Sequence, residues 1–360
     1  MTSVFTDLSL LQPGGRHGGI KPALYRLLRI LNCRRNVLIR VIAQKGIHEE
    51  LSTESDIDDE NILSTDQFAQ LPLAKDTVLF SPLPSLGLYR PERKTIFMCP
   101  DLLHKDYPDS LSPEDINYRH HLFSEAAKKV DQFVTVSKFS KSRLMDLYDI
   151  QGDRIHVIPH ASLTKEKPNQ PSMKERYFIY PANGWKHKNH QTLLTGYHSY
   201  RQNVSSPWKL LLTGHFSNEV SSLLRENLKA LRIQESVRLC GYLDPDTFLE
   251  TFANAACLLF PSMYEGFGLP LLEAMQLEIP IIASNQLAIK ETAGDAALFV
   301  DARSPIKLSE AMVKIHNDEH LRKQLVEKGK VQVNAFSWTT AAAEFENLVG
   351  KISYSIPNSI

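Results

Sequence analysis

Segments typical of β-strands alternate with segments typical of α-helices along most of the chain, and this alternation runs through two successive blocks. In the first block we expect strands at 4–10, 36–43, 77–80, 95–99, 132–136 and 155–159, and helices at 21–31, 113–129 and 140–148. In the second block we expect strands at 177–180, 209–213, 236–239, 256–260, 280–283 and 297–300, helices at 190–200 and 219–231, and a helical tail from 306 onward. Strands that alternate with helices form parallel sheets, so the two blocks predict two doubly wound α/β domains.

A polar segment with two prolines separates the two blocks, at 162–173. We therefore expect a first domain at 1–165, a second domain at 172–336, and a C-terminal helix and tail at 337–360. The length of 360 residues, at roughly 150 residues per domain, also favours two domains. Ligands of such folds bind beyond the carboxyl ends of the strands, and the default site of a two-domain chain is the cleft between the domains.

Charge and hydrophobicity narrow the functional classes. Forty-one Lys and Arg residues balance 41 Asp and Glu residues, which argues against a general nucleic-acid binder. The chain shows neither the roughly 18 consecutive apolar residues of a spanning helix nor a signal-peptide pattern, so we expect a cytoplasmic protein or one peripheral to the inner face of a membrane. Four separated cysteines beside apolar runs predict buried free thiols: Cys33, Cys99, Cys240 and Cys257.

The strongest functional signal follows the fourth expected strand of the second block. Gly266 and Gly268 lie in the loop, and a helix is expected to begin near Pro270, a residue favoured in the first turn. Glycines let the backbone approach a ligand closely, and the free N–H groups of a helix N-terminus attract phosphate. Glu265 in the loop and Glu273 in the helix add two carboxylates that are suited to sugar hydroxyls.

This segment resembles the E-x7-E signature of the retaining glycosyltransferases of family 4, which adopt the GT-B fold of two Rossmann-like domains facing a cleft. Other segments resemble the phosphate-contact loop of the mannosyltransferase-like branch (180–190), strand ends beside the nucleotide base (211–214, 240–243), and acceptor-domain landmarks (101–108, 136–140, 157–159). The resemblance covers nearly the whole chain and is strongest over 177–301. It also implies that the C-terminal helix returns to the first domain.

The resemblance implies roles for the matching residues of the second domain. Glu265 would contact the donor sugar near its reacting carbon, and Lys188 would neutralise the diphosphate leaving group, unless it is only a solvent-exposed lysine. Glu273 would accept hydrogen bonds from the ribose hydroxyls. The other donor-binding positions implied are Gly266, Phe267, Gly268, Leu269, Asn183, Gly214, Tyr242 and Leu243. Asn183 stands where most of the family has an arginine, as is common in the mannosyltransferase-like branch.

In the first domain the resemblance is looser. Gly18 and Gly19 would approach the phosphates from a loop that also carries Arg16, which either adds charge or is simply exposed. Many family members have a histidine just before Asp101, where this chain has Pro100, a residue that can neither donate a hydrogen bond nor transfer a proton. Either His104 takes part of that role on the acceptor side, or it is a packing or capping histidine.

No convincing metal site is expected. Two Asp-x-Asp patterns occur, but the one at 56–58 lies in an acidic run at 49–60 that is typical of a solvated loop, and the one at 244–246 begins a helix, as an N-cap does. His187 and His190 have a ligand-like spacing but no third partner nearby. The resemblance likewise implies transfer without a divalent ion.

Together these features predict a retaining transferase that moves a hexose from a nucleotide-sugar to a saccharide or lipid-linked saccharide, in surface-polysaccharide synthesis. The phosphate-contact loop favours GDP-mannose, with a UDP-hexose as the alternative, and no cofactor beyond this co-substrate. A non-catalytic nucleotide-sugar-binding partner and a nucleotide-sugar epimerase on the same fold are the other hypotheses. Contact with anionic lipid, or merely a solvated basic face, is suggested by Lys21, Arg26, Arg29, Arg34, Arg35 and Arg40.

Overall fold

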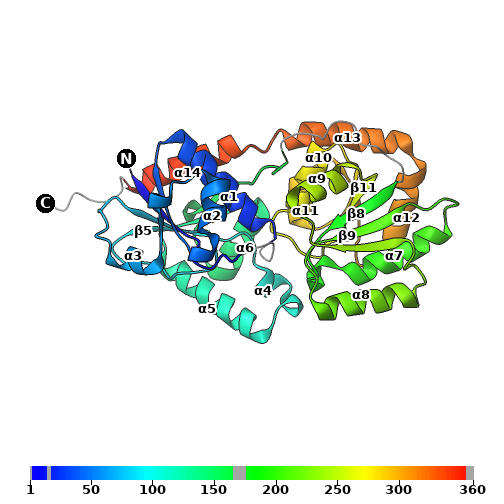
Figure 1. Cartoon of the computed structure of the whole chain (residues 1–360), viewed down its shortest axis with the longest axis horizontal. Coiled ribbons are helices and arrows are strands. Elements are labelled where there is room, and N and C mark those ends of the chain that lie inside the picture. Colours follow the sequence, from blue (N-terminus) through cyan, green and yellow to red (C-terminus); the bar gives the residue numbers. More distant parts are fainter. Residues whose placement is uncertain (1, 14–17, 165–175, 354–360) are drawn as a thin grey trace. The chain divides into compact units, whose positions relative to one another are not determined.

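The computed structural model describes residues 2–13, 18–164 and 176–353, and its chain divides into two compact units (Figure 1). The first unit comprises residues 1–160 together with 336–360, and the second comprises residues 161–335. Each unit is built on a parallel sheet with strands joined by helices, so the predicted pair of doubly wound α/β domains is confirmed. The first stretch of the first unit runs to His160, and the sequence analysis expected the first domain at 1–165.

The described strands of the first unit form one parallel sheet with the order β3-β2-β1-β4-β5-β6-β7. Their bounds are β1 Ser3–Asp7, β2 Leu38–Ile42, β3 Ile62–Leu63, β4 Val78–Ser81, β5 Lys94–Met98, β6 Gln132–Thr135 and β7 Ile155–Val157. Six of these match strands expected from apolar runs. The two-residue strand β3 was not expected, because a segment this short has no readable periodicity.

Helices of the first unit pack on this sheet and on one another. Their bounds are α1 Ile20–Arg34, α2 His48–Ser55, α3 Thr65–Gln70, α4 Leu103–Asp106, α5 Pro113–Lys129, α6 Lys138–Tyr148 and α14 Trp338–Ser353. The expected return of the C-terminal helix is confirmed, since α14 packs beside α1 (Figure 1). Arg34 of α1 lies 2.9 Å from the Glu346 carboxylate, and the rings of Phe80 and Phe345 are 4.7 Å apart.

The described strands of the second unit form a parallel sheet with the order β10-β9-β8-β11-β12-β13. Its strands are β8 Tyr177–Pro181, β9 Lys209–Thr213, β10 Val237–Gly241, β11 Cys257–Phe260, β12 Ile281–Ser284 and β13 Ala297–Val300. Its helices are α7 His190–Gln202, α8 Asn218–Ala230, α9 Pro245–Ala253, α10 Leu269–Gln276, α11 Leu287–Ala293, α12 Pro305–Asn317 and α13 Glu319–Val333. The expected N-cap is confirmed, because Asp244 accepts a hydrogen bond from the Thr247 backbone N–H at 3.0 Å.

The interpretation of 49–60 as a solvated loop is wrong. Helix α2 occupies most of this run because Leu51 is fully buried against α1 and Glu50 forms an ion pair with Lys21 at 2.6 Å. Lys21 is only 4% exposed, so it does not contribute to a basic surface. Arg34 also has an internal acidic partner, and the Arg40 guanidinium lies over the Phe5 ring.

The four cysteines are free thiols, as expected, but they are not all buried. Cys99 and Cys257 are buried, whereas Cys33 is exposed and Cys240 is partly exposed. Helix α1 buries Leu31. Cys33 lies two positions further along this helix, so it points to the opposite side and is exposed. Among the described residues, none of the helices combines the length and the apolar character needed to cross a bilayer.

Candidate functional site

The order in which strands are added to the sheet of the second unit changes direction between β8 and β11. Strand β8 lies between β9 and β11, so the chain leaves β8 toward β9 on one side and leaves β11 toward β12 on the other. The loops after β8 and β11 therefore diverge at the carboxyl edge of the sheet. This is the position at which doubly wound α/β folds bind their ligands.

The loop after β8 presents Lys188 at the end of a short 3₁₀ turn, Lys186–Lys188. Asn189 follows with φ +62°, a left-handed conformation that asparagine tolerates better than most residues. Its side-chain amide donates to the backbone carbonyls of Pro261 at 3.2 Å and Ala302 at 2.7 Å. These bonds fix the point at which the loop turns into α7.

The loop after β11 carries Glu265 and ends at Gly268, where α10 begins as predicted, with Pro270 in its first turn. Gly268 has φ +102°, and an added Cβ would lie 2.9 Å from the Leu271 side chain, so the turn requires glycine. Phe267 is buried, and its backbone carbonyl accepts a hydrogen bond from the Thr292 hydroxyl at 2.8 Å. Gly266 and Leu269 lie on either side of this turn.

The structure brings together the two predicted catalytic side chains. Lys188 Nζ lies 2.6 Å from Glu265 Oε1, and both side chains are 13% exposed. The ammonium group also lies 5.8 Å from the centre of the Trp185 ring, which is itself 46% exposed. A cation and an anion 77 positions apart in the sequence thus form one partly buried pair at the diverging loops.

Glu273 is buried one turn into α10. Burial raises the pKa of its carboxyl to about 7. Unlike Glu265, it has no cation beside it among the described residues that would offset the cost of burying its charge. A carboxyl that is buried without compensation near a helix N-terminus is suited to a ligand that donates hydrogen bonds.

The predicted positions after β8 and β9 interlock. Asn183 Oδ1 accepts a hydrogen bond from the His215 backbone N–H at 2.9 Å, so this amide oxygen supports the neighbouring loop. Gly214 has φ +134°, and an added Cβ would lie 2.5 Å from the Ala182 carbonyl oxygen. On the next strand, Tyr242 is 58% exposed and Leu243 is partly exposed, so both can contact a ligand.

Replacing Gly214 with alanine should destabilise the second unit by more than about 2 kcal/mol, because strain at positive φ adds to a clash with backbone. Gly241 is the matched control, since it has φ +70° but open space where a Cβ would lie. Gly241→Ala should cost only about 1 kcal/mol, the backbone contribution. Urea unfolding measures both free energies, and equal losses would show that the contact with Ala182 is unimportant.

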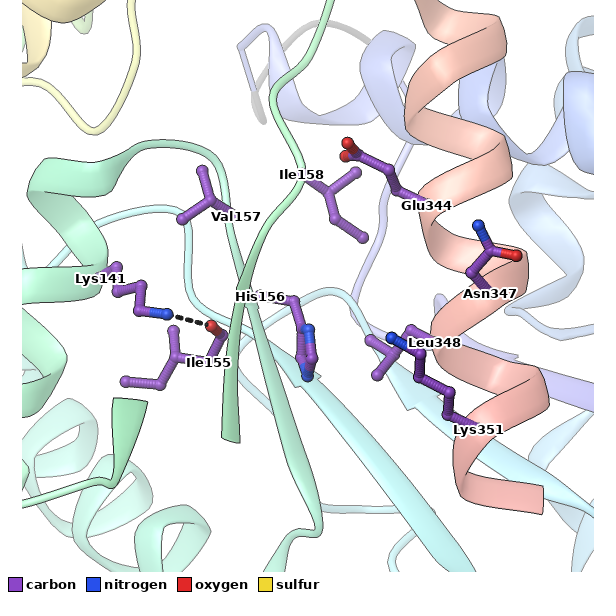
Figure 2. Close-up of a pocket in the computed structure, with 9 residues that line it drawn as sticks. All are labelled: Lys141, Ile155, His156, Val157, Ile158, Glu344, Asn347, Leu348 and Lys351. Atoms are coloured by element: carbon purple, nitrogen blue, oxygen red, sulfur yellow. Dashed lines mark hydrogen bonds between the residues drawn. The ribbon is translucent and has the colours of Figure 1, made fainter. Parts of the chain in front are cut away.

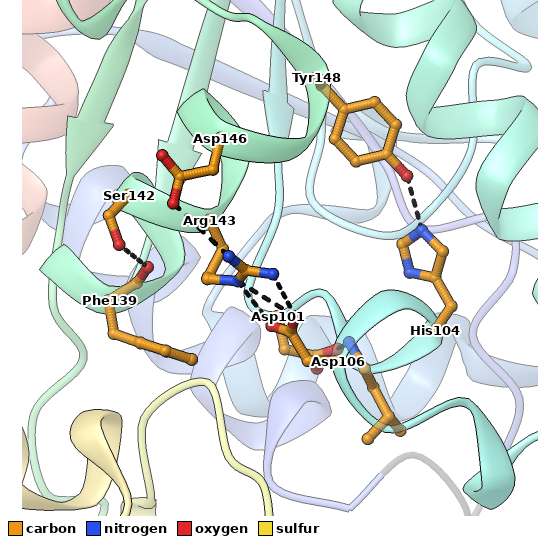
Figure 3. Close-up of polar contacts among 9 residues, drawn as sticks. Asp101, His104, Asp106, Phe139, Ser142, Arg143, Asp146 and Tyr148 are labelled. Atoms are coloured by element: carbon orange, nitrogen blue, oxygen red, sulfur yellow. Dashed lines mark hydrogen bonds and ion pairs between the residues drawn. The ribbon is translucent and has the colours of Figure 1, made fainter.

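In the first unit, His104 packs against the rings of Phe123 and Tyr148, and Figure 3 shows its contact with Tyr148. Its side chain is buried, and Nε2 lies 2.7 Å from the Tyr148 hydroxyl. Burial, reinforced by the positive charge of Arg119, lowers the pKa of His104 to about 4. Asp101 Oδ1 accepts a hydrogen bond from the Leu103 backbone N–H at 3.0 Å. These contacts match the packing alternative for His104 and place Asp101 at the start of α4.

The glycine loop after β1 is described only in part. Gly18 has φ +58°, and Gly19 directly precedes α1. Arg16 lies outside the described residues. As in the second unit, the sheet order changes direction beside the strand that precedes this loop, between β1 and β4.

In the described part of the chain, no three His, Cys, Asp or Glu side chains are grouped in a way that could hold a metal ion. His187 and His190 are both buried. His190 hydrogen-bonds to the Ala182 backbone, and burial lowers its pKa to about 4.

A separate groove of about 430 Å³ lies in the first unit, beside the end of β7 and one face of α14 (Figure 2). Lys141 is one of the residues that line the groove, and its ammonium group donates to the Ile155 carbonyl at 2.8 Å. None of the predicted site residues lines it. The lining residues are Lys141, Ile155, His156, Val157, Ile158, Glu344, Asn347, Leu348 and Lys351.

Sequence reasoning missed the side chains that hold the two loops together. Tyr180, Trp185 and Asn189 were included only as members of the segment that resembles a phosphate-contact loop, without individual roles, and Ser262 was given no role. One signal was readable, an asparagine immediately before a helix.

Comparison with known proteins agrees with this geometry. Residues 162–332 match the family model described as "Glycosyl transferases group 1". The chain is 26% identical over 264 residues to O-antigen chain mannosyltransferase B of Escherichia coli, covering 70% of this chain and 67% of that protein. It is 27% identical over 198 residues to O-antigen chain mannosyltransferase RfbU of Salmonella typhimurium, covering 54% and 53%. The matched region thus spans between half and two thirds of these relatives.

Solved structures share the fold over nearly the full length. Anabaena Alr3699/HepE, crystallised in complex with UDP, aligns with a TM-score of 0.75 at 13% identity, covering 98% of this chain and 100% of that one. WaaG, a glycosyltransferase involved in lipopolysaccharide biosynthesis, aligns with a TM-score of 0.71 at 14% identity, covering 96% and 99%. The predicted GT-B architecture is therefore confirmed.

Proposed function

We propose that the chain, whose residues 162–332 match the glycosyl transferases group 1 family model, transfers mannose from GDP-mannose to a saccharide or lipid-linked saccharide, with retention of configuration, in surface-polysaccharide synthesis. The observation that carries the proposal is the Lys188–Glu265 pair at the diverging loops, beside the N-terminus of α10. Two relatives are O-antigen chain mannosyltransferases, which supports the sugar and the pathway class.

Each predicted donor residue has a chemical task in this reaction. Cleavage of the sugar–phosphate bond leaves negative charge on the diphosphate, and fixed positive charge that meets it is usually the largest catalytic contribution. Lys188 and the free N–H groups at the start of α10 would supply that charge without a divalent ion. Glu265 neutralises Lys188 in the ligand-free chain and would face the sugar when the diphosphate binds.

The nucleoside half would bind further along the same edge of the sheet. Glu273 would accept hydrogen bonds from the two ribose hydroxyls, which would compensate the burial of its carboxylate. Tyr242 and Leu243 would contact the base after β10. The acceptor would be bound by the first unit, where Asp101 and the Gly18–Gly19 loop follow the carboxyl ends of strands. Peripheral contact with anionic lipid would rely on the remaining basic residues of α1 and its flank, Arg26, Arg29 and Arg35.

A panel of nucleotide-sugars with lipid-linked and free saccharide acceptors tests the proposal, read by release of nucleoside diphosphate in the presence of EDTA. We expect turnover with GDP-mannose that EDTA leaves unchanged. Turnover with a UDP-hexose alone would show that the donor is a UDP-hexose and not GDP-mannose. Loss of activity with EDTA would contradict the metal-free reaction. Binding of nucleotide-sugar without turnover for any acceptor would favour a non-catalytic partner of another transferase.

A further inference from the structure

The hydroxyl of Tyr180 connects the two loops that carry the catalytic pair. Tyr180 lies near the end of β8 and is completely buried. Its hydroxyl donates to the Lys188 carbonyl at 2.7 Å and lies 3.1 Å from Ser262 Oγ. A phenol has one proton, and the Lys188 carbonyl can only accept, so the Ser262 hydroxyl donates to Tyr180. One phenol oxygen therefore bonds to the loop of Lys188 and to the loop of Glu265.

The strand ladder between β8 and β11 does not reach as far as this connection. The ladder between β8 and β11 consists of Phe178 with Cys257 and Ile179 with Leu258, and it stops before either strand ends. Pro181, the last residue of β8, has no N–H to extend it. Beyond that point the two strands send their loops in opposite directions. The Tyr180 hydroxyl joins the two loops just beyond the end of the ladder, through the Lys188 carbonyl and the Ser262 hydroxyl.

Further bonds make the Ser262 end of the bridge rigid. The Ser284 hydroxyl donates to the Ser262 carbonyl at 2.6 Å, and the Met263 backbone N–H donates to the His187 carbonyl at 2.7 Å. The bridge is thus attached to β12 on one side and to the 3₁₀ turn of Lys188 on the other. A shift of the tyrosine hydroxyl would move both loops.

We infer that Tyr180 is a positioning residue, whose hydroxyl holds the Lys188 ammonium and the Glu265 carboxylate in register for the transfer. This inference rests on the proposed function of that pair. A misplacement of about 1 Å in a catalytic group can cost on the order of a hundredfold in rate, so a bond that sets loop position affects turnover even though it touches no substrate.

Tyr180→Phe removes the hydroxyl and keeps the ring. We expect kcat to fall by about tenfold to a hundredfold, with a smaller change in KM for the nucleotide-sugar. Tyr177→Phe is the matched control, because Tyr177 lies on the same strand and its hydroxyl also donates to a backbone carbonyl, that of Thr251, at 2.7 Å. Its kcat should stay within about twofold of wild type. Equal losses in the two variants would show that Tyr180 has only a structural role.

The Lys188→Ala background separates positioning from general damage. There Tyr180→Phe should cause little further loss, because the group it positions is gone. An unchanged loss in that background would overturn the inference. Should Tyr180→Phe not fold, Ser262→Ala removes one end of the bridge, and wild-type turnover in that variant would likewise contradict it.

A crystal structure of Tyr180→Phe tests the inference independently of the reaction. We expect Lys188 Nζ and Glu265 Oε1 to separate beyond hydrogen-bonding distance, from 2.6 Å in the parent chain. An unchanged pair would refute positioning, even if wild-type turnover is found. Absence of wild-type turnover with every donor would instead count against the proposed function, while the separation of the pair would still support the positioning role.

Discussion

Replacing Lys188 with alanine is expected to lower kcat/KM for the nucleotide-sugar by about a hundredfold to a thousandfold. The reaction builds negative charge on the departing diphosphate, and the Lys188 ammonium is a fixed cation only 13% exposed to water, where its charge is weakly screened. The substitution also leaves the Glu265 carboxylate without its ionic partner at 2.6 Å. Both consequences destabilise the transition state more than they weaken binding of the nucleotide-sugar in the ground state.

Lys186→Ala is the matched control for this result. Lys186 begins the same 3₁₀ turn but is exposed, so its loss should leave kcat/KM within about threefold of wild type, as exposed charges usually do. Steady-state release of nucleoside diphosphate measures both variants, and circular dichroism confirms that each is folded. A loss below about tenfold in folded Lys188→Ala would contradict the role given to this lysine.

Glu273→Gln is expected to stabilise the ligand-free protein at pH 8 and to weaken nucleotide binding. The Glu273 pKa rises from 4.5 in the unfolded chain to about 7 in the folded one, because burial disfavours the charged form. Between pH 4.5 and about pH 7, Glu273 loses its proton in the unfolded state but keeps it in the folded state. The free energy of unfolding therefore falls as pH rises through this range. The full cost, reached above pH 7, is at most roughly 3 kcal/mol.

The amide carries no charge, so the variant avoids this cost. We expect a gain of about 1 to 2 kcal/mol at pH 8 and none at pH 4.5, measured by thermal unfolding across pH. Affinity for GDP should fall by about tenfold to a hundredfold, because two hydrogen bonds to a carboxylate are lost. Glu226→Gln, on the exposed face of α8, should change neither quantity. A variant that binds GDP normally would contradict the ribose contact.

The alternation of apolar runs predicted the fold closely. The bounds expected for α5, β9 and β13 agree with the structure, and α5 begins at a clear signal, Pro113 after the N-cap Ser112. The short helices α2 and α3 were not expected. The capping box of α3, in which the Ser64 and Gln67 side chains each bond to the other's backbone, is a sequence signal that was available. Helix α2 depends instead on packing against α1, which a single sequence does not show.

The resemblance indicated candidate residues for the site but not the contacts between them. The resemblance supplied Lys188, Glu265 and Glu273, but the contact between the first two depends on which strands are neighbours. Asn183 was expected among the donor-binding positions, and the hydrogen bond that its amide oxygen accepts from the His215 backbone N–H was not foreseen. The role of Tyr180 depends on hydrogen bonds to the Lys188 carbonyl and to the Ser262 hydroxyl, which no local pattern encodes.

We propose that the diphosphate of a sugar nucleotide binds where the glycine turn of the second unit becomes α10, in contact with Lys188. A crystal structure of the chain with GDP-mannose tests it directly. The account predicts diphosphate oxygens within hydrogen-bonding distance of Lys188 Nζ and of the first backbone N–H groups of α10, with the ribose hydroxyls on Glu273. A nucleotide bound elsewhere, with Lys188 still paired only to Glu265, would contradict it.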